Sequence, residues 1–371
     1  MNAPLPTESA TTTAAATGVP ATAPAAGGTR TARAVVLGAS GYSGSEFVRL
    51  ALGHPGVEIV AIVSRDAEGR TASDVLAGID PRAGHLPPVV DVAGLVSRLE
   101  DGACDTVIAC LPHGGWRGLL AESAALASAV EGARTIDLSS DHRDGSAGYV
   151  YGLPEAFRTE IRDASRIANP GCYATAAALA LLPAAEQGWL GGDVVVSALS
   201  GASGAGRAAT LRTSFVELDG GAAFYKVGTE HAHVPEMERT LARTAGKGTR
   251  APRVAFAPQL VPMARGILLT AQAPLARPVT QEEARRAYEA RYADEPFVRV
   301  LRAGEGPETR NVRGSNRVDV QVMTLFDGTV LLATAALDNL GKGAAGQSIQ
   351  NLNLMLGWPE TTALPRHGSP V

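Results

Sequence analysis

A short apolar run followed by three evenly spaced glycines constrains the fold of this chain more than any other feature. Residues 34–37 are all apolar, as expected of a central parallel strand that is buried on both faces. The next segment, 38–44, has glycine at every third position, and residues 45–52 read as a helix. A strand, a glycine-rich turn and a helix form the phosphate-binding corner of a dinucleotide fold. We therefore predict an α/β Rossmann domain that begins near residue 32.

Three more apolar runs between residues 57 and 138 extend the predicted parallel sheet. The first of them, residues 57–63, ends in Ser64 and Arg65, where an NAD site usually has an Asp or Glu for the ribose hydroxyls. A hydroxyl and a guanidinium suit a 2′-phosphate, so we expect NADP(H) as the cofactor. The alternative is that Arg65 is a solvated loop residue and that Asp66 contacts the ribose.

A single cysteine lies where a tight turn runs into an Ala/Leu-rich helix that continues to about Leu182. Pro170 fixes one backbone angle, Gly171 permits an unusual one, and Cys172 falls at the helix start. The N–H groups and partial positive charge of a helix N-terminus favour thiolate over thiol. The same N–H groups, with the amide of Asn169, could hold a developing oxyanion. The alternative is a capped helix with a buried, inert cysteine.

His231 and His233 are the closely spaced histidine pair of the sequence. Histidine titrates near neutral pH, so either one could take a proton from a thiol or give one to a leaving group. Two histidines at this spacing can also hold zinc, but no third ligand is evident nearby, and we expect no metal. A purely structural role for one of the two histidines stays open.

Loops at strand ends supply the other candidate contacts. Arg143 and Arg207 each follow a predicted strand closely and could bind an anionic substrate. As lone residues, the two arginines could equally be surface charges. Tyr225, which precedes the histidine pair, is a third candidate for substrate binding. Backbone N–H groups of small-residue loops can also point at a ligand. The residues that we expect to bind the cofactor are Gly38, Ser40, Gly41, Tyr42, Ser43, Gly44, Ser64, Arg65, Pro112, Ser203, Gly204 and Asn339.

The second half of the chain predicts a different kind of domain. Residues 193–199 begin a new series of strands, and residues 253–256 and 266–272 are expected to continue it. Thr280 opens a helix to about Tyr292 through a capping box. Residues 317–325 alternate apolar and polar side chains, turn at Asp327-Gly328, and return through 330–337 as a hairpin. We therefore predict an α+β domain with a mixed sheet.

Composition narrows the class of protein. The chain has 371 residues, which favours two domains, and its net charge of -4 without a basic cluster argues against nucleic acid as a partner. No apolar run is long enough to span a bilayer, and three cysteines in so long a chain suggest a reducing compartment. The first thirty residues could pass for a transit peptide, but we interpret them as a disordered extension of a cytoplasmic protein.

Several motifs in order resemble the N-acetyl-gamma-glutamyl-phosphate reductases of arginine biosynthesis, over roughly residues 32–360. The motifs are Gly38 to Gly44, Tyr151 to Glu155, Asn169 to Thr175, Ser200 to Arg207, His231 to Glu236, Pro262 to Gly266, Gly314 to Asn316 and Asp338 to Gln347. The chain departs from the family at Gln259, where His is frequent, and at Ala232, where Arg often separates the histidines.

The resemblance implies NADPH-dependent reduction of an acyl phosphate to a semialdehyde through a thioester on Cys172, with His231 or His233 as acid/base. It also implies a homo-oligomer, a dimer or tetramer, and a Rossmann domain that recruits the C-terminal helix. The expected division is a disordered extension at 1–31, a Rossmann domain at 32–168 completed by 338–371, and an α+β catalytic domain at 169–337.

Three other functions compete with this one. Aspartate-semialdehyde dehydrogenase performs the same chemistry on a shorter substrate, and a related reductase acts on a carrier-bound glutamyl or aminoadipyl phosphate. A non-catalytic NADP-binding regulator on the same scaffold is the alternative outside enzymes. Because such regulators tend to lose the nucleophile or the base, the presence of Cys172 and of both histidines favours an enzyme.

Overall fold

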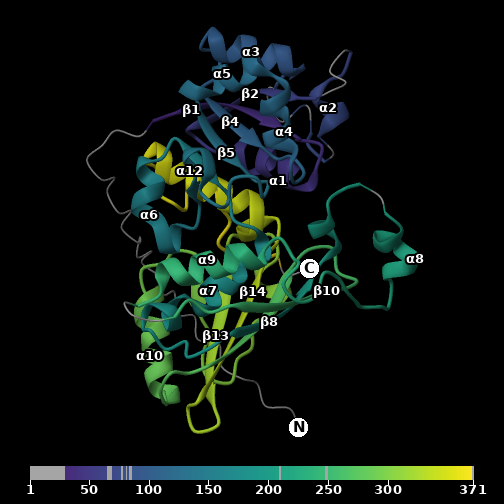
Figure 1. Cartoon of the computed structure of the whole chain (residues 1–371). Coiled ribbons are helices and arrows are strands. Elements are labelled where there is room, and N and C mark those ends of the chain that lie inside the picture. Colours follow the sequence, from purple (N-terminus) through teal and green to yellow (C-terminus); the bar gives the residue numbers. More distant parts are fainter. Residues whose placement is uncertain are drawn as a thin grey trace, which may run out of the picture.

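Two seven-stranded sheets form the body of the molecule, one in the upper and one in the lower half of Figure 1. The computed structural model describes residues 30–64, 69–76, 78–80, 82, 86–208, 210–246 and 250–369. The predicted extension at residues 1–31 therefore lies outside the described residues, apart from Arg30 and Thr31. Among the helices of the described part, none combines the length and the apolar character that crossing a membrane requires.

The first sheet is parallel throughout, with the order β3-β2-β1-β4-β5-β7-β6, which confirms the predicted Rossmann architecture. Its strands are β1 Ala32–Leu37, β2 Val57–Val63, β3 Val89–Val90, β4 Thr106–Ala109, β5 Arg134–Asp137, β6 Val150–Tyr151 and β7 Arg166–Ala168. The helices of this half are α1 Tyr42–Ala51, α2 Ala72–Val75, α3 Val92–Glu100, α4 Gly115–Glu122, α5 Ala124–Ala129 and α6 Pro154–Asp163.

Both faces of this sheet are covered, as the all-apolar strands require. Val35 and Leu37 of β1 belong to one apolar cluster, together with residues of α3, α4 and α5. Ala34 and Val36 belong to a second cluster on the other face, with residues of α1 and α6. Alternate side chains of a single strand thus support two layers of helices.

The glycine corner (residues 38–44) joins β1 to α1. Gly38 has φ of +73°, and a Cβ there would lie 2.3 Å from the carbonyl oxygen of Cys110, at the end of β4. A Cβ on Gly44 would lie 2.4 Å from the carbonyl oxygen of Gly38. Because these close contacts tighten the turn, α1 begins at Tyr42, three residues before the helix predicted from sequence.

The second sheet is mixed, as predicted, with the order β12-β13-β14-β11-β8-β10-β9. Its strands are β8 Val194–Ser200, β9 Ala223–Phe224, β10 Val254–Leu260, β11 Ile267–Pro274, β12 Val298–Val300, β13 Val318–Leu325 and β14 Val330–Leu337. The helices of this half are α7 Cys172–Glu186, α8 Phe215–Leu218, α9 Val234–Thr244, α10 Gln281–Tyr292 and α11 Thr309–Val312.

The predicted hairpin is confirmed by the antiparallel pair β13 and β14, but the strand predicted to end at Phe256 was too short. β10 continues through Pro258 to Leu260. The carbonyl oxygen of Pro258 accepts a hydrogen bond from the N–H of Tyr225, on the side of the edge strand β9. The proline nitrogen faces the same way, so its missing N–H removes no bond to the neighbouring central strand β8.

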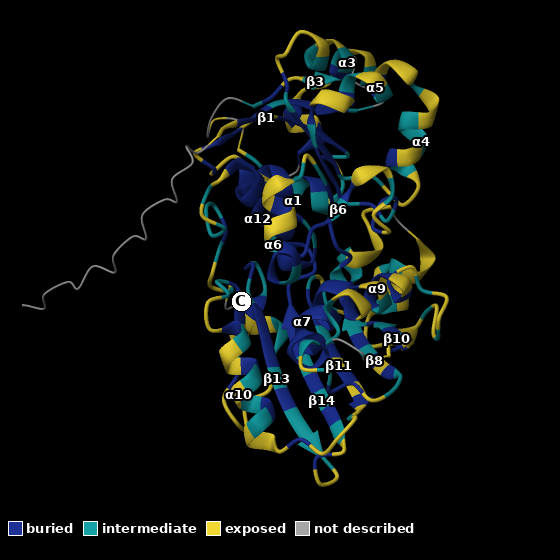
Figure 2. Cartoon of the chain, turned by 60° about the vertical axis from the view of Figure 1, so that its left-hand side comes forward, coloured by how far each residue is buried: buried dark blue, intermediate teal, exposed yellow. Residues whose placement is uncertain are grey.

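α7 is buried almost throughout its length, from Tyr173 to Ala185. It contacts β11, β13 and β14 of the second sheet, and α9, α10 and the segment Gly341–Ala345 on its other sides. Figure 2 shows α7 in dark blue beside these strands. Since its residues are mostly Ala and Leu, no side of this helix could face water, and its first residue, Cys172, is held in place by the layers around it.

The chain returns to the first sheet at its end. A turn of π-helix, Gly341–Ala345 (the π-turn), leads into α12 Gly346–Leu356, which packs against α1 and α6. The backbone N–H of Arg30 donates to the carbonyl oxygen of Leu356, so the start of the described chain lies against the end of α12.

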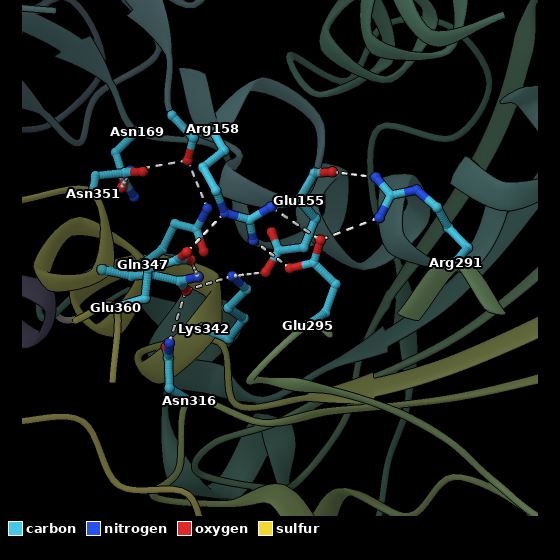
Figure 3. A network of polar contacts seen from close by, with 12 residues as sticks. Glu155, Arg158, Asn169, Arg291, Glu295, Asn316, Lys342, Gln347, Asn351 and Glu360 are labelled. Carbon is cyan, nitrogen blue, oxygen red and sulfur yellow. Dashed lines mark hydrogen bonds and ion pairs between the residues drawn. The ribbon is translucent and has the colours of Figure 1, made fainter. Parts of the chain in front are cut away.

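A buried polar network fixes the π-turn and α12 against α6 (Figure 3). The ammonium of Lys342, which is fully buried, donates to Glu155 Oε1 and Gln350 Oε1, both at 2.7 Å. Around this pair, Arg158 of α6 binds Glu295 and Glu360 through ion pairs. Charged groups thus join the two halves where the C-terminal segment crosses between them.

Replacing Lys342 by methionine is expected to lower the free energy of unfolding by about 3–5 kcal/mol, because Glu155 would be left as an unpaired buried carboxylate. The double substitution K342M/E155M should recover most of this loss, since two apolar side chains need no compensating charge. Urea unfolding of both variants measures the difference. Arg286→Met, which breaks the exposed pair with Glu282, serves as the control and should cost less than about 1 kcal/mol. Equal losses in the single and double variants would contradict the prediction.

Candidate active site

A cavity of about 1540 Å³ opens between the glycine corner and the start of α7. It brings together most of the residues predicted from sequence, although they come from both halves of the chain. Those that line it are Gly38, Ser40, Gly41, Tyr42, Ser43, Pro112, Arg143, Asn169, Cys172, Ser203, Gly204, Arg207, Tyr225, His231, His233 and Asn339.

Three residues expected to bind the cofactor are not among the lining. Gly44 lies within α1, against the backbone of Gly38 and Ala39. Ser64 follows β2, and its N–H donates to the carbonyl oxygen of Val90. Arg65 lies outside the described residues, so its assignment stays a prediction.

Cys172 is the first residue of α7 and borders this cavity. Burial raises the pKa of its thiol to about 11, while Arg143 and the backbone N–H of Tyr173 act in the opposite direction. The expectation that the helix start favours a thiolate is therefore wrong for the free protein, because desolvation outweighs the helix terminus. Cys172 rests as a thiol and needs a base to remove its proton.

His233 lies directly beside the turn that precedes the cysteine. A Cβ built on Gly171 would fall 2.2 Å from His233 Nε2, so this nitrogen occupies the space that any larger residue would fill. Burial, followed by the charge of Arg143, holds the pKa of His233 well below its usual value. The imidazole is thus neutral at neutral pH and able to accept a proton from the thiol.

His231 is a second neutral imidazole, fixed in one orientation. Its Nδ1 accepts a hydrogen bond from the backbone N–H of His233 at 3.1 Å, which places its own proton on Nε2. Burial and the nearby charge of Lys226 lower the pKa of His231 to about 4. Its ring contacts the rings of Tyr173 and Tyr225, whose hydroxyl groups are hydrogen-bonded to each other at 2.7 Å.

Arg143 lies in this cluster, but its N–H groups are largely occupied. Its guanidinium donates to the carbonyl oxygens of Asn169 at 2.9 Å and Leu138 at 3.0 Å, and to Glu236 Oε2 at 3.0 Å. Glu236 belongs to one of the motifs recognised in the sequence, but the sequence analysis assigned it no role. Its position three residues after His233, on the first turn of α9, is the signal that could have pointed to it.

Asn169 ties the nucleophile turn to the C-terminal segment (Figure 3). Its side-chain nitrogen donates to the carbonyl oxygen of Ala344 at 3.2 Å, and its side-chain oxygen accepts from Asn351 at 3.2 Å. A Cβ on Gly343 would lie 2.7 Å from the Cβ of Cys172. The π-turn therefore forms the wall of the cavity against the cysteine, as such irregular turns often do at functional sites.

The small-residue loop 200–207 faces the glycine corner across the cavity. Arg207 donates to the carbonyl oxygen of Ser40 at 2.8 Å, which places this cation beside the corner. Asn339 donates to the hydroxyl oxygen of Ser203 at 2.9 Å and accepts from the N–H of Gly266 at 2.7 Å. These contacts hold the loop and the segment after β14 together.

The corner fits a dinucleotide. Gly41, which precedes α1, makes no side-chain cap there, so the first N–H groups of this helix are free to bind a pyrophosphate. Sequence reasoning gave no role to four further cations or imidazoles of the lining, Arg70, His113, Arg212 and Lys226. Within the described ranges, no group of three or more His, Cys, Asp or Glu could hold a metal ion.

Two protein-family models match consecutive parts of the chain. Residues 33–164 match the family described as semialdehyde dehydrogenase, NAD binding domain, and residues 172–339 match semialdehyde dehydrogenase, dimerisation domain. Among solved structures, aspartate semialdehyde dehydrogenase II from Vibrio cholerae, complexed with ASA, superposes with a TM-score of 0.68 at 18% identity, covering 88% of this chain and 98% of that one. The enzyme with NADP from Candida albicans gives 0.65 at 17% identity, with the same coverage. At these identities the likeness shows the fold.

Curated relatives are much more similar in sequence. The N-acetyl-gamma-glutamyl-phosphate reductase of Thermus thermophilus is 44% identical over 359 residues, which cover 90% of this chain and 99% of the relative. That of Moorella thermoacetica is 40% identical over 352 residues, covering 90% and 97%. With such identity over nearly the full length of both chains, the protein belongs to the N-acetyl-gamma-glutamyl-phosphate reductase family.

Proposed function

We propose that this chain reduces N-acetyl-γ-glutamyl phosphate to N-acetylglutamate 5-semialdehyde and phosphate, with NADPH as the reductant. One observation carries the proposal: a thiol, a neutral imidazole beside it and a dinucleotide-binding corner share one cavity. The names of the relatives supply the substrate. An acyl phosphate is already activated, so the site needs no ATP-binding motif.

His233 Nε2 takes the thiol proton of Cys172 as the sulfur attacks the phosphorylated carbonyl carbon. A C–S bond forms and the bond from carbon to the phosphate oxygen breaks, which leaves a thioester on Cys172 and releases phosphate. When bound, NADPH supplies a hydride to the thioester carbon. The C–S bond then breaks, the semialdehyde leaves, and the proton on His233 returns to the sulfur.

The negative oxygen formed in each addition step needs hydrogen-bond donors. The N–H of Gly171 is occupied by Glu236, so the donors that we assign are the free N–H groups of the first turn of α7 and the amide of Asn169. Arg143, Arg207 and Tyr225 are the candidates for contact with the phosphate and carboxylate groups of the substrate. His113 and Lys226, which also line the cavity, add to this set.

Cys172→Ser is expected to lower turnover by at least about a thousandfold, because a serine hydroxyl at this position is a far weaker nucleophile. The assay is phosphate-dependent reduction of NADP with N-acetylglutamate semialdehyde, the reverse reaction. NADPH affinity should stay within about twofold, as the sulfur is not part of the glycine corner. Cys104→Ser, in the buried core, is the control and should retain activity. Substantial turnover by the Cys172 variant would exclude the thioester route.

Arg65→Asp tests the preference for NADPH over NADH. Loss of a guanidinium that pairs with the 2′-phosphate should raise the KM for NADPH by at least about tenfold and leave that for NADH nearly unchanged. Steady-state kinetics with both cofactors provides the measurement. Arg70, which lines the described cavity, is the alternative partner. A loss confined to Arg70→Asp would reject the assignment to Arg65.

We further infer that the chain forms a homo-oligomer through the face of the second sheet that α7, α9 and α10 leave open. The register of β8, β10, β11, β13 and β14 places one set of alternate side chains on this face. In the described part of these strands, Asp319 is the one charged residue on the open face, and it is paired with Arg299 and Arg317. The others are Val195, Ser197, Leu199, Ala255, Ala257, Gln259, Leu268, Thr270, Gln272, Pro274, Gln321, Met323, Leu325, Val330, Leu332, Thr334 and Ala336.

A sheet face so poor in charge is typical of an interface rather than of a surface in water. The match of residues 172–339 to a family described as a dimerisation domain supports the same conclusion. A second copy of the chain, packed on this face through a two-fold axis, would cover the uncharged strands of both copies.

The double substitution V195D/T270D is expected to shift the protein from dimer or tetramer to monomer at micromolar concentration, because two carboxylates would be buried without partners. Light scattering after size-exclusion chromatography measures the mass. Arg286→Asp, on the exposed side of α10, should leave the mass unchanged. A parent protein that is already monomeric under these conditions would refute the interface.

A further inference from the structure

The carboxylate of Glu236 joins three segments around the nucleophile turn. Its Oε1 accepts hydrogen bonds from the backbone N–H of Gly171 at 2.7 Å and from the hydroxyl of Tyr151 at 2.5 Å. Its Oε2 accepts from Arg143 Nη1 at 3.0 Å. Glu236 is 2% exposed and does not belong to the cavity lining. Any influence of this carboxylate on the chemistry must therefore act through its neighbours.

Gly171, the residue before Cys172, is held through both its N–H group and its carbonyl oxygen. On one side, the N–H of Gly171 binds Glu236; on the other, the carbonyl oxygen of Gly171 accepts from the backbone N–H and the hydroxyl of Thr175, at 2.8 and 3.1 Å. The position of the cysteine at the start of α7 thus depends on a side chain from α9.

The base lies at the start of the same helix. His233 precedes the helix and Glu236 lies three residues later, so the two side chains are neighbours on one face. With Glu236 fixed to the N–H of Gly171, the imidazole is brought against the same glycine, where a Cβ would be 2.2 Å from Nε2. One carboxylate therefore sets the separation of nucleophile and base.

Glu236 also neutralises a charge next to the thiol. Arg143 Nη1 would lie 2.6 Å from a Cβ on Gly171, so its guanidinium is nearly as close to this turn as the imidazole, at 2.2 Å. The ion pair with Glu236 is buried on both sides, with side chains 6% and 1% exposed. Without the carboxylate, the positive charge would act alone on Cys172 and on His233.

We propose that Glu236 is a positioning residue, which fixes the separation between Cys172 and His233 and balances the charge of Arg143 beside them. For its turnover readout this inference rests on the proposed function. A second readout, the alkylation of Cys172 by iodoacetamide as a function of pH, needs no substrate and keeps the two proposals distinguishable.

Glu236→Gln keeps the shape of the side chain and removes its charge. We expect kcat to fall by at least about thirtyfold, because the charge of Arg143 is then uncompensated beside the thiol and the imidazole, and the KM for NADPH to stay within about threefold. The midpoint of Cys172 alkylation should move to lower pH, because Arg143 then favours the thiolate without compensation. Glu238→Gln, on the same helix and bonded to the N–H of Val254, is the matched control and should change neither quantity.

Tyr151→Phe provides a second variant that keeps the ion pair and removes one hydrogen bond to Glu236. Tyr151 does not line the cavity either, and its hydroxyl donates to Glu236, so we expect its loss to lower kcat about fivefold with KM unchanged. If Glu236→Gln fails to fold, this variant decides the question.

A kcat within twofold of the parent in both variants, with an unmoved alkylation midpoint, would overturn the proposal for Glu236 and leave the proposed function intact. A reduced yield of folded protein with normal kcat per folded molecule would also overturn it, since the role would then be structural. A parent that is inactive on N-acetylglutamate semialdehyde, with a midpoint that moves in Glu236→Gln, would support the positioning role and reject the proposed function.

Discussion

The burial of α7 on every side is the constraint on which the arrangement of this chain depends. A helix made mostly of Ala and Leu has no face that could be left to water, so the second sheet, two helices and the π-turn surround it. Its first residue cannot then be displaced without moving all of these layers. The cysteine at its N-terminus is accordingly held where the C-terminal segment, the glycine corner and α9 meet.

Much of the fold followed from patterns that are local in sequence. The apolar run before Gly38, the glycine spacing and the alternation in residues 317–337 each determine structure within a few residues, and the sheet, the corner and the hairpin formed as expected. The errors occurred where the pairing of segments distant in sequence determines the structure. β10 runs on through Pro258 because the edge strand lies on the side of its nitrogen, and no local pattern reveals which strand will be at an edge.

The same distinction applies to the site. Sequence reasoning found many of the cavity-lining residues because strand ends and helix starts gather ligands, but it mistook the state of Cys172 and assigned no role to Glu236. The ionisation of a thiol depends on how completely the surrounding layers exclude water, which is a property of the packed molecule. The partners of Glu236 come from positions 65 to 93 residues earlier in the chain, so no spacing rule could have found them.

The two halves of the molecule contribute to one site because the chain passes between them more than once. Lys342 and Glu155 hold the last crossing in the interior, and Asn169 bonds to this C-terminal segment next to the nucleophile. The cofactor corner and the cysteine are thus parts of one arrangement, and a family of enzymes can vary its substrate contacts without rebuilding that arrangement.

The protonated state of Cys172 in the free protein has a consequence for its durability. Oxidants such as hydrogen peroxide react with the thiolate form of cysteine and hardly at all with the neutral form. A sulfur that gives up its proton to a neighbouring imidazole only when it attacks is therefore shielded from sulfenic acid formation between turnovers. Desolvation of this side chain, which looks like an obstacle to nucleophilic attack, raises the pKa of its thiol and thereby opposes the form with which such oxidants react.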